Sequence, residues 1–481
     1  MNRTALLALL PLVFSTTAAF SEASDEGAAH LTEVFQTYLG TTEGVVSVVV
    51  EGDSYSVTLD AAPLSAMATE AGGSASMTPI VLSLTDNGDG TWDVSQDQPF
   101  SMSFAIPGQS DYTATYGSLT LDGVFDEALM TFSTAKGAAS DIKTVQKMTD
   151  PNMGDVSIET TIAALTTEMT GQAGASGGVD GTYSFMATGY NGSFVTPASD
   201  GMPPMSVGYT IESATQTGQM TGLRSDAIYK AFAWFVAHPS QEAMQADKAA
   251  MKTILAGGFP LFGSLTGDVV AKNILVNSPM GDIGIAEVGV KVEANGVVAD
   301  GRVREAFSIS GVTLPAGLVP DWAAPILPQK MSFDVEVTDF DAAAAAQVAL
   351  GLFDLPAGTE PDAVFEADLL AALLPNKTVT ITMNPGGLSG DGYALTYEGS
   401  MVAGPEMPVP TGKALITLTG IETLQAALDA APEDIKGQAM MPIGMAQGMA
   451  KAGANGELIW EIDASTPGSL SVNGMNMMGG N

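Results

Sequence analysis

The sequence contains no cysteine and only two histidines, His30 and His238, among its 481 residues. Without cysteine the chain can form no disulfide, thiolate nucleophile, thiolate metal site or cysteine-linked lipid anchor. Two histidines exclude a histidine-rich zinc site, although carboxylate sites remain possible. We expect both histidines to be structural. His30 lies in a predicted helix, AAHLTEVFQTYL, and His238 precedes a proline, where it would meet the last carbonyl groups of another helix.

Basic residues are also scarce. The chain has 17 Lys and Arg against 54 Asp and Glu, a formal net charge of −37, and no basic residue lies between Arg3 and Lys136. Binding to a phosphate backbone requires clustered cations, so the composition argues against nucleic acid and, for the same reason, against anionic lipid headgroups. The acidity fits solubility in a salty medium. The alternative explanation of the acidity is that the protein binds a cationic ligand or a divalent metal.

Familiar catalytic motifs are missing as well. The sequence contains no Gly-x-Ser-x-Gly elbow, Walker loop or His-Glu-x-x-His helix. STAK at 133–136 and SDIK at 140–143 match Ser-x-x-Lys, but the companion Ser-Asp-Asn and Lys-Thr-Gly motifs are absent. Carboxylates are too numerous to single out a glycosidase-like pair. The sequence therefore predicts no catalytic, cofactor-binding or metal-binding residue, and no cofactor.

The turn cluster DNGDG raises the question of a calcium loop. An EF-hand loop that places Gly90 sixth would have Thr85 first, Asn87 third, Asp89 fifth and Gln96 twelfth, so the first Asp and the final bidentate Glu are missing. Alternating apolar residues flank the cluster on both sides. This pattern predicts a β-hairpin whose turn residues tolerate positive φ.

The N-terminus has the layout of a secretory signal peptide. A basic start, MNR, is followed by the apolar run ALLALLPLVF and by the small residues STTAAF. We predict a signal peptide at 1–19 with cleavage after Ala19, and Ala23 as the alternative. Since no later segment offers 18 uninterrupted apolar residues, we expect no transmembrane anchor after cleavage. The sequence thus predicts a periplasmic or secreted protein.

Alternation of apolar and polar residues dominates the rest of the chain. In MSFDVEVT, Met331 and Phe333 point one way while Ser332 and Asp334 point the other, and YSVTLD, FSMSFAI, TVTITM and ELIWEI repeat the pattern. Strands with one apolar, buried face and one polar, solvated face are typical of antiparallel sheets. We therefore predict an α+β, mainly β fold: one or more large curved antiparallel sheets with several helices packed on one face.

Helices interrupt this pattern at a few places. Residues 223–258 predict two helices divided at His238-Pro239. Two later segments share a strand, a corner, an acid in the first helical turn (Asp341, Glu422) and an Ala/Leu-rich helix. We predict an N-terminal β-rich lobe (20–221), a helical bridge (222–258) and a C-terminal β-rich lobe with inserted helices (259–481). One continuous domain is the alternative.

Methionine is frequent, with 26 residues. Met441, Met445 and Met449 fall on one face of a predicted helix in which Gly444 and Gly448 would admit another element. A second group closes the chain: Met475, Met477 and Met478. We expect ordinary core packing of the helix across a sheet. Copper(I) binding by thioethers and a flexible apolar groove are the alternatives.

A proline-rich run precedes one of the strands. Pro315, Pro320, Pro325 and Pro328 prevent regular structure, and Trp322 among them is expected to anchor the crossing chain. The run GVTLPAGLVPDWAAPILPQKMSFDVEVTDFD (311–341) and the closing GELIWEIDASTPGSLSVNGMNM resemble an exported bacterial family, the domain-of-unknown-function family numbered 2125. The resemblance implies export and family membership, and no established reaction.

Two functions of different class follow from these patterns. The first is a non-enzymatic envelope protein with a structural role or a site for an apolar ligand such as a lipid chain. The second is a hydrolase that acts on envelope polymers with carboxylates alone. A close carboxylate pair in a deep cleft would favour the hydrolase, and an apolar groove without such a pair would favour the first function.

Overall fold

The structure of the protein is a computed structural model. The structure describes six segments of the chain: residues 22–65, 72–150, 154–197, 205–238, 240–356 and 358–478. The predicted signal peptide and the cleavage position after Ala19 lie outside these segments. The alternative position, Ala23, packs against the N-terminal hydrophobic core described below.

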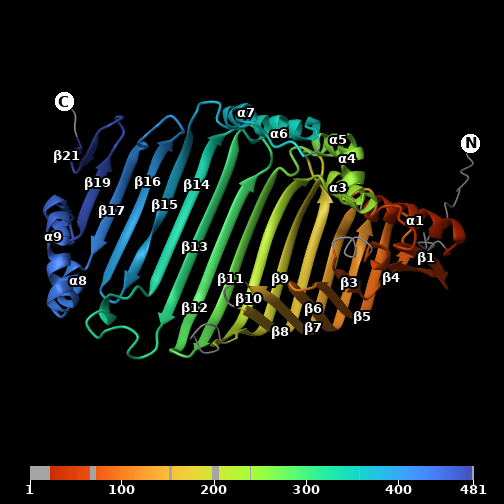
Figure 1. Ribbon diagram of the computed structural model, residues 1–481, viewed down its shortest axis with the longest axis horizontal. Helices are drawn as coiled ribbons and strands as arrows, with labels where there is room; N and C mark the ends of the chain where they lie inside the picture. The colour runs from red at the N-terminus through yellow and green to blue at the C-terminus, as the bar shows by residue number, and fades with distance from the viewer. Residues whose placement is uncertain are drawn as a thin grey trace, which may run out of the picture.

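The described strands form one antiparallel sheet of 21 strands (Figure 1). The first ten strands are β1 (Val46–Glu51), β2 (Ser54–Leu59), β3 (Ser74–Met77), β4 (Ile80–Asp86), β5 (Thr91–Ile106), β6 (Ser110–Asp126), β7 (Thr131–Asp150), β8 (Gly154–Ala173), β9 (Val179–Thr196) and β10 (Met205–Leu223). The others are β11 (Ser264–Ser278), β12 (Gly281–Asn295), β13 (Gly301–Thr313), β14 (Lys330–Phe340), β15 (Val379–Gly390), β16 (Tyr393–Ala403), β17 (Thr411–Thr419), β18 (Lys451–Ala452), β19 (Leu458–Asp463), β20 (Leu470–Val472) and β21 (Met475–Met478). The predicted mainly β, antiparallel fold is confirmed.

Strand order mostly follows chain order. From β5 to β17 each strand pairs with the next, while β2 pairs with β4, and β17 and β18 both pair with β19. Among the described strands, β1 pairs only with β2 and β21 only with β20, so the sheet is open. Each predicted alternating segment is a strand of this sheet, because its apolar side chains can all project from one side.

Most helices lie along one edge of the sheet or at its two ends (Figure 1). They are α1 (Asp25–Leu39), α3 (Ser225–Ala237), α4 (Gln241–Ala246), α5 (Lys248–Gly258), α6 (Ala342–Ala349), α7 (Ala363–Leu373), α8 (Ile421–Asp429) and α9 (Glu433–Met449). In Figure 1, α3 to α7 follow the upper edge, α1 lies at the N-terminal end, and α8 and α9 lie at the C-terminal end.

The helical segment between β10 and β11 divides at the predicted place. Helix α3 ends at Ala237, and α4 begins after Ser240, whose hydroxyl oxygen accepts a hydrogen bond from the Ala243 amide. A second division occurs at Asp247, between α4 and α5. Although these helices separate them in sequence, β10 and β11 pair directly from Thr221 opposite Ser264 onward. The sheet therefore continues across the predicted bridge.

The two predicted strand-to-helix units are also present. Helix α6 follows β14, and the Asp341 carboxylate accepts a hydrogen bond from the Ala344 amide 2.7 Å away, which caps the first turn. Helix α8 follows β17 through Gly420, with Glu422 in its first turn. Each acid lies where the partial positive charge of a helix N-terminus is strongest.

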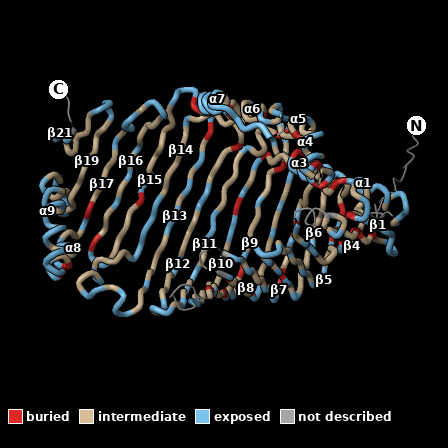
Figure 2. Tube along the Cα trace, viewed as in Figure 1, coloured by how far each residue is buried: buried red, intermediate tan, exposed pale blue. Residues whose placement is uncertain are grey.

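A hydrophobic core forms at the N-terminal end of the sheet, where α1 covers β2, β4 and β5. Leu31 from the helix meets Val57 and Leu84 from the sheet, and all three side chains are fully buried. The ring of Trp92 packs edge-to-face on Tyr55, with the two ring centroids 5.7 Å apart. Figure 2 shows that buried residues are confined to short stretches elsewhere in the sheet.

The DNGDG cluster is a hairpin turn, as predicted. It joins β4 to β5, with Gly88 and Gly90 at positive φ. The carboxylate of Asp89 accepts hydrogen bonds from the amide and hydroxyl of Thr91. These bonds lower the pKa of Asp89 and use its carboxylate within the turn itself.

Candidate functional site: the apolar face of the sheet

The two faces of the sheet differ sharply in polarity. Directly opposed residues on neighbouring antiparallel strands lie on the same face. From β14 to β11, two neighbouring rows of opposed residues read Phe333, Phe307, Val290, Val269 and Met331, Ile309, Val288, Ala271. We call the face on which these rows lie the apolar face, and the opposite face the polar face.

The same apolar face contains the buried side chains of the central strands. The buried apolar side chains of β6 to β9 are Ala114, Ala135, Ala139, Ile142, Val156, Ile162, Val179 and Ala187. Four of them form one cluster with partly buried neighbours such as Tyr116 and Phe185. These neighbours belong to the same face of the same sheet, so the cluster is formed by the sheet alone.

A line of left-handed residues crosses the central strands next to this cluster. Asp141, Gly189, Asn273 and Gly311 lie on β7, β9, β11 and β13, with φ between 50° and 67°. Strand pairing continues on both sides of the line without a register shift. In a regular strand, residues three positions apart lie on opposite faces. Ala139 and Ile142, on either side of Asp141, nevertheless belong to the same buried cluster, so the side-chain alternation shifts by one residue at this line. We call this line the crease.

Two glycines on the apolar face accommodate the rings of opposed tyrosines. A Cβ atom on Gly218 would lie 2.3 Å from the Tyr183 ring, and one on Gly192 would lie 2.1 Å from the Tyr209 ring. Each tyrosine directly opposes its glycine across β9 and β10. The bare glycine backbone therefore lets the ring lie flat over the sheet, which compensates for the missing side chain.

Large apolar side chains are exposed where the apolar face passes through β11 to β14. Six of them, between 38% and 52% exposed, define the apolar patch: Val269, Val292, Val303, Phe307, Met331 and Phe333. They occupy four adjacent strands and therefore form one continuous surface. A contiguous exposed surface of this kind commonly marks a binding site, whereas single exposed apolar residues do not.

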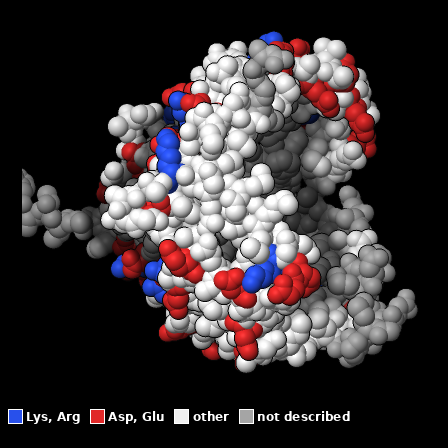
Figure 3. Space-filling view, turned by 90° about the vertical axis from the view of Figure 1, so that its left-hand side faces the viewer, with Lys and Arg blue, Asp and Glu red and all other residues white. Residues whose placement is uncertain are grey.

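The basic residues of the described strands lie away from this surface. Figure 3 looks onto the C-terminal end of the molecule and shows a hollow on one side, with acidic residues gathered in groups around the end and few basic residues. All basic residues of the described strands lie on the polar face, alternating with apolar side chains, as Lys291 does between Val290 and Val292. The apolar face thus offers no cation to a ligand.

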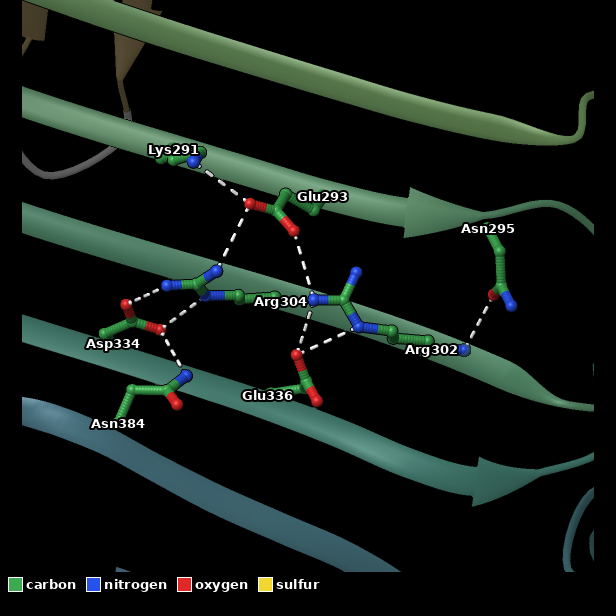
Figure 4. A network of polar contacts seen from close by, with 8 residues as sticks. All are labelled: Lys291, Glu293, Asn295, Arg302, Arg304, Asp334, Glu336 and Asn384. Atoms are coloured by element: carbon green, nitrogen blue, oxygen red, sulfur yellow. Dashed lines mark hydrogen bonds and ion pairs between the residues drawn. The ribbon is translucent and has the colours of Figure 1, made fainter. Parts of the chain in front are cut away.

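The polar face carries an ion-pair network over β12 to β15 (Figure 4). The guanidinium of Arg304 donates to both carboxylate oxygens of Asp334, at 2.9 and 2.7 Å. Arg302 donates to Glu336 at 2.6 Å and to Glu293 at 3.1 Å. The carboxylates are only 16% to 24% exposed, so solvent screens these contacts less than it screens a pair on an open surface.

The network shifts the pKa values of Asp334, Glu293 and the two arginines. Hydrogen bonds from Arg304 and then Asn384 lower the pKa of Asp334, and those from Lys291 and then Arg302 lower the pKa of Glu293. Hydrogen bonds to the opposing carboxylates raise the pKa of both arginines. These shifts favour the charged forms of Asp334, Glu293 and the two arginines.

We expect an Arg304→Gln variant to lose about 1–3 kcal/mol of unfolding free energy, because it leaves the poorly exposed Asp334 carboxylate without its bidentate partner. Asp334 and Glu293 have lowered pKa values in the folded protein. Their stabilisation is therefore complete above their ordinary pKa values and is lost as the pH falls below about 4.

Urea unfolding curves recorded from pH 7 down to pH 3 measure this effect. The free-energy difference between the two proteins should shrink as the pH falls. A difference that stays constant over this range would contradict the assigned role of the Asp334 carboxylate. The exposed ion pair Lys136–Glu168, 76% and 62% exposed, supplies the control variant Lys136→Gln, which should change stability by less than 1 kcal/mol.

Both histidines make structural contacts, as predicted. Nε2 of His30 lies 3.0 Å from the Glu127 carboxylate, which also accepts a hydrogen bond from the Trp92 indole. His238 stacks on Trp234, and its Nδ1 donates to the Trp234 carbonyl oxygen 2.7 Å away, at the end of α3.

The prediction that the methionine helix packs in the core is wrong. Met440, Met441 and Met445 of α9 are 57%, 74% and 58% exposed. A Cβ atom on Gly444 or Gly448 would meet nothing within 4 Å, so these glycines admit no neighbouring element. Met475 and Met477, each 43% exposed, lie on the terminal strand β21. The helix is attached to the sheet through a hydrogen bond from the Trp460 indole to its backbone. Met440, Met441 and Met445 face outward, and Met449 is half-buried.

The remaining sequence patterns take ordinary places. STAK and SDIK both lie along β7, where Lys136 and Lys143 pair with Glu168 and Glu159 rather than with the serines. Trp322 is half-buried beside a short 3-10 turn, Ala324–Ile326. Its anchoring role stays a prediction.

The described residues contain no group of three or more His, Asp or Glu side chains placed to hold a metal ion. Among them, every carboxyl group whose pKa is clearly shifted has it lowered, as at Asp89, Glu293, Asp334, Glu457 and Asp463. A carboxylic acid that donates a proton in glycoside hydrolysis requires a raised pKa. These shifts do not support the carboxylate hydrolase.

Comparisons with known proteins add little. No family model matches the chain, and no curated protein matches it. The siderophore receptor PirA from Acinetobacter baumannii is a weak structural match, with a TM-score of 0.17 and 8% identity over 76% of this chain. The match spans 62% of the receptor's length, and so low a score carries no argument. The resemblance to family 2125 stays a prediction.

Among the described residues, none of the helices combines the length and the apolar character needed to cross a lipid bilayer.

Proposed function

We propose that this is an exported, non-enzymatic protein that binds an apolar ligand, such as a lipid acyl chain, on the apolar patch. The observation that carries the proposal is the patch itself: six large apolar side chains left 38% to 52% exposed on one face of four adjacent strands. Elsewhere on the same face, the α1 core and the buried cluster at the crease remove comparable side chains from water. A bound apolar ligand would remove the side chains of the apolar patch from water in the same way.

The proposal includes a bend of the sheet toward its apolar face along the crease. A sheet whose own side chains bury one another on one face is expected to curve toward that face, since a flat single layer leaves them in water. The cluster around Ala139 and Ala187 and the left-handed residues Asn273 and Gly311 support this bend. The hollow in Figure 3 fits the same geometry.

The expected affinity is modest. Complete burial of one methylene group contributes about 0.8 kcal/mol, so a twelve-carbon chain that lies with one side on the patch gains about 5 kcal/mol. This free energy corresponds to a dissociation constant of roughly 10⁻⁴ M. Longer chains, or two chains side by side, would bind more tightly.

A pair of methionines provides a matched test. Met331 lies in the patch and Met186 lies on the polar face of β9, and both side chains are 45% exposed. We expect Met331→Glu to weaken the binding of dodecanol, measured by displacement of the fluorescent probe N-phenyl-1-naphthylamine, by at least tenfold. An isolated charge under an acyl chain is costly to desolvate. Met186→Glu should bind dodecanol as the wild type does.

Thermal unfolding of both variants confirms that each is folded before binding is compared. Absence of dodecanol binding by the wild type would overturn the proposal, and so would an equal loss in the two variants. Export is tested separately by N-terminal sequencing of the protein recovered from the periplasm, which should begin at residue 20 or 24.

A further inference from the structure

One charged side chain interrupts the apolar patch. Glu305 lies on β13 between Val303 and Phe307, and its directly opposed neighbours are Val292 on β12 and Val335 on β14. The structure describes all of residues 264–340. Within this range, Glu305 is on the apolar face in the middle of a strand, and the other charged side chains lie on the polar face, at strand ends or outside the strands.

Glu305 has no partner among the described residues, in contrast to Glu293, Asp334 and Glu336 of the polar-face network. Its sequence neighbour Arg304 points to the polar face, where it bonds Asp334 and Glu293. The described residues place no hydrogen-bond donor or cation against the Glu305 carboxylate. It is exposed, so water solvates it in the free protein. A ligand that covered the patch would displace that water, and a carboxylate deprived of water requires a donor or a positive charge in its place.

We propose that the ligand of the apolar patch is a cationic amphiphile, with a positively charged ammonium head on Glu305 and its chain over the patch. This inference rests on the proposed function and names the chemical class of its ligand. All basic residues of the strands lie on the polar face, so the positive charge has to come from the ligand. The rings of Phe307 and Phe333 flank the position, and aromatic rings attract ammonium groups. The net charge of −37 attracts cations over a longer range.

Three ligands with the same twelve-carbon chain separate the head group from the chain: dodecylammonium, dodecanol and dodecanoate. Dodecylammonium and dodecanoate are titrated below their micelle concentrations and dodecanol below its solubility limit, at pH 7 and low salt, with displacement of N-phenyl-1-naphthylamine as the readout. We expect the wild type to bind dodecylammonium about tenfold more tightly than dodecanol, and dodecanoate more weakly than both.

The isosteric variant Glu305→Gln should bind dodecanol as before and lose the preference for the ammonium head. Glu398→Gln is the control, because Glu398 is also exposed but lies on the polar face of β16. It removes the same charge from the molecule and should keep the preference. Its retention separates local recognition by Glu305 from general attraction by an acidic protein.

The outcomes that overturn the inference are distinct from those that overturn the proposed function. Equal binding of dodecylammonium and dodecanol by the wild type, or a preference that survives in Glu305→Gln, overturns the cationic head and leaves the apolar site intact. Failure of all three ligands to bind overturns both.

Discussion

A Trp92→Ala variant is expected to lose about 3–5 kcal/mol of unfolding free energy, the largest effect of a single side-chain truncation in this protein. Trp92 is 4% exposed and lies between α1 and the sheet, against Tyr55. Truncation leaves a cavity that its strand-bound neighbours cannot fill, since their positions are set by backbone pairing. It also removes the indole donor to the Glu127 carboxylate.

Two variants separate these contributions, with unfolding followed by circular dichroism in guanidinium chloride. Trp92→Phe keeps much of the apolar volume and loses the indole N–H, so it should cost about 1–2 kcal/mol. Trp322→Ala removes a half-buried tryptophan from an irregular segment and should cost less than Trp92→Ala. Equal losses at positions 92 and 322 would show that the N-terminal core does not stabilise the sheet in the way described.

A Gly420→Ala variant is the second large effect that we expect, with a loss of about 2–5 kcal/mol. Gly420 joins β17 to α8 in a left-handed conformation, φ 69°. This conformation costs an alanine about 1–2 kcal/mol. An added Cβ atom would also lie 1.8 Å from the carbonyl oxygen of Gly392 in the β15–β16 turn. Because that obstacle is backbone, the helix or the turn has to move, which typically costs a further 1–3 kcal/mol.

Gly456→Ala is the matched control for position 420. Gly456 also has positive φ, 88°, but an added Cβ atom there meets nothing within 4 Å. It should show the conformational cost alone, about 1–2 kcal/mol. If the two alanine variants unfold at the same guanidinium concentration, the contact between Gly420 and the β15–β16 turn does not constrain the start of α8.

Much of the fold could be predicted because strands and turns have local causes. The alternation in MSFDVEVT places Met331 and Phe333 on one side of a strand, and the DNGDG cluster predicts the hairpin that follows β4. The division of the helices near His238 follows from the proline beside it. These are properties of neighbouring residues, and the structure agrees with each of them.

The candidate site could not be predicted in the same way. Sequence alternation marks Met331 and Phe333 as apolar-facing, which normally means buried, and the structure leaves both exposed. Glu305 occurs in the series Val303, Glu305, Phe307, but its place at the centre of the patch depends on the strands paired to either side. The methionine helix shows the same limit, because regular spacing does not reveal whether another element covers the spaced face.

By itself the amino-acid sequence determined the alternating strands, the DNGDG turn, the helix division near His238 and the low content of thiols, imidazoles and cations. These depend on covalent chemistry, backbone preference and spacing over a few residues. Only the tertiary structure decided that the strands form one open sheet, that left-handed residues line up across it, and that α1 covers one end of the apolar face while the patch remains exposed. Exposure is a property of what lies opposite a residue in space, and residues far apart in the chain decide it.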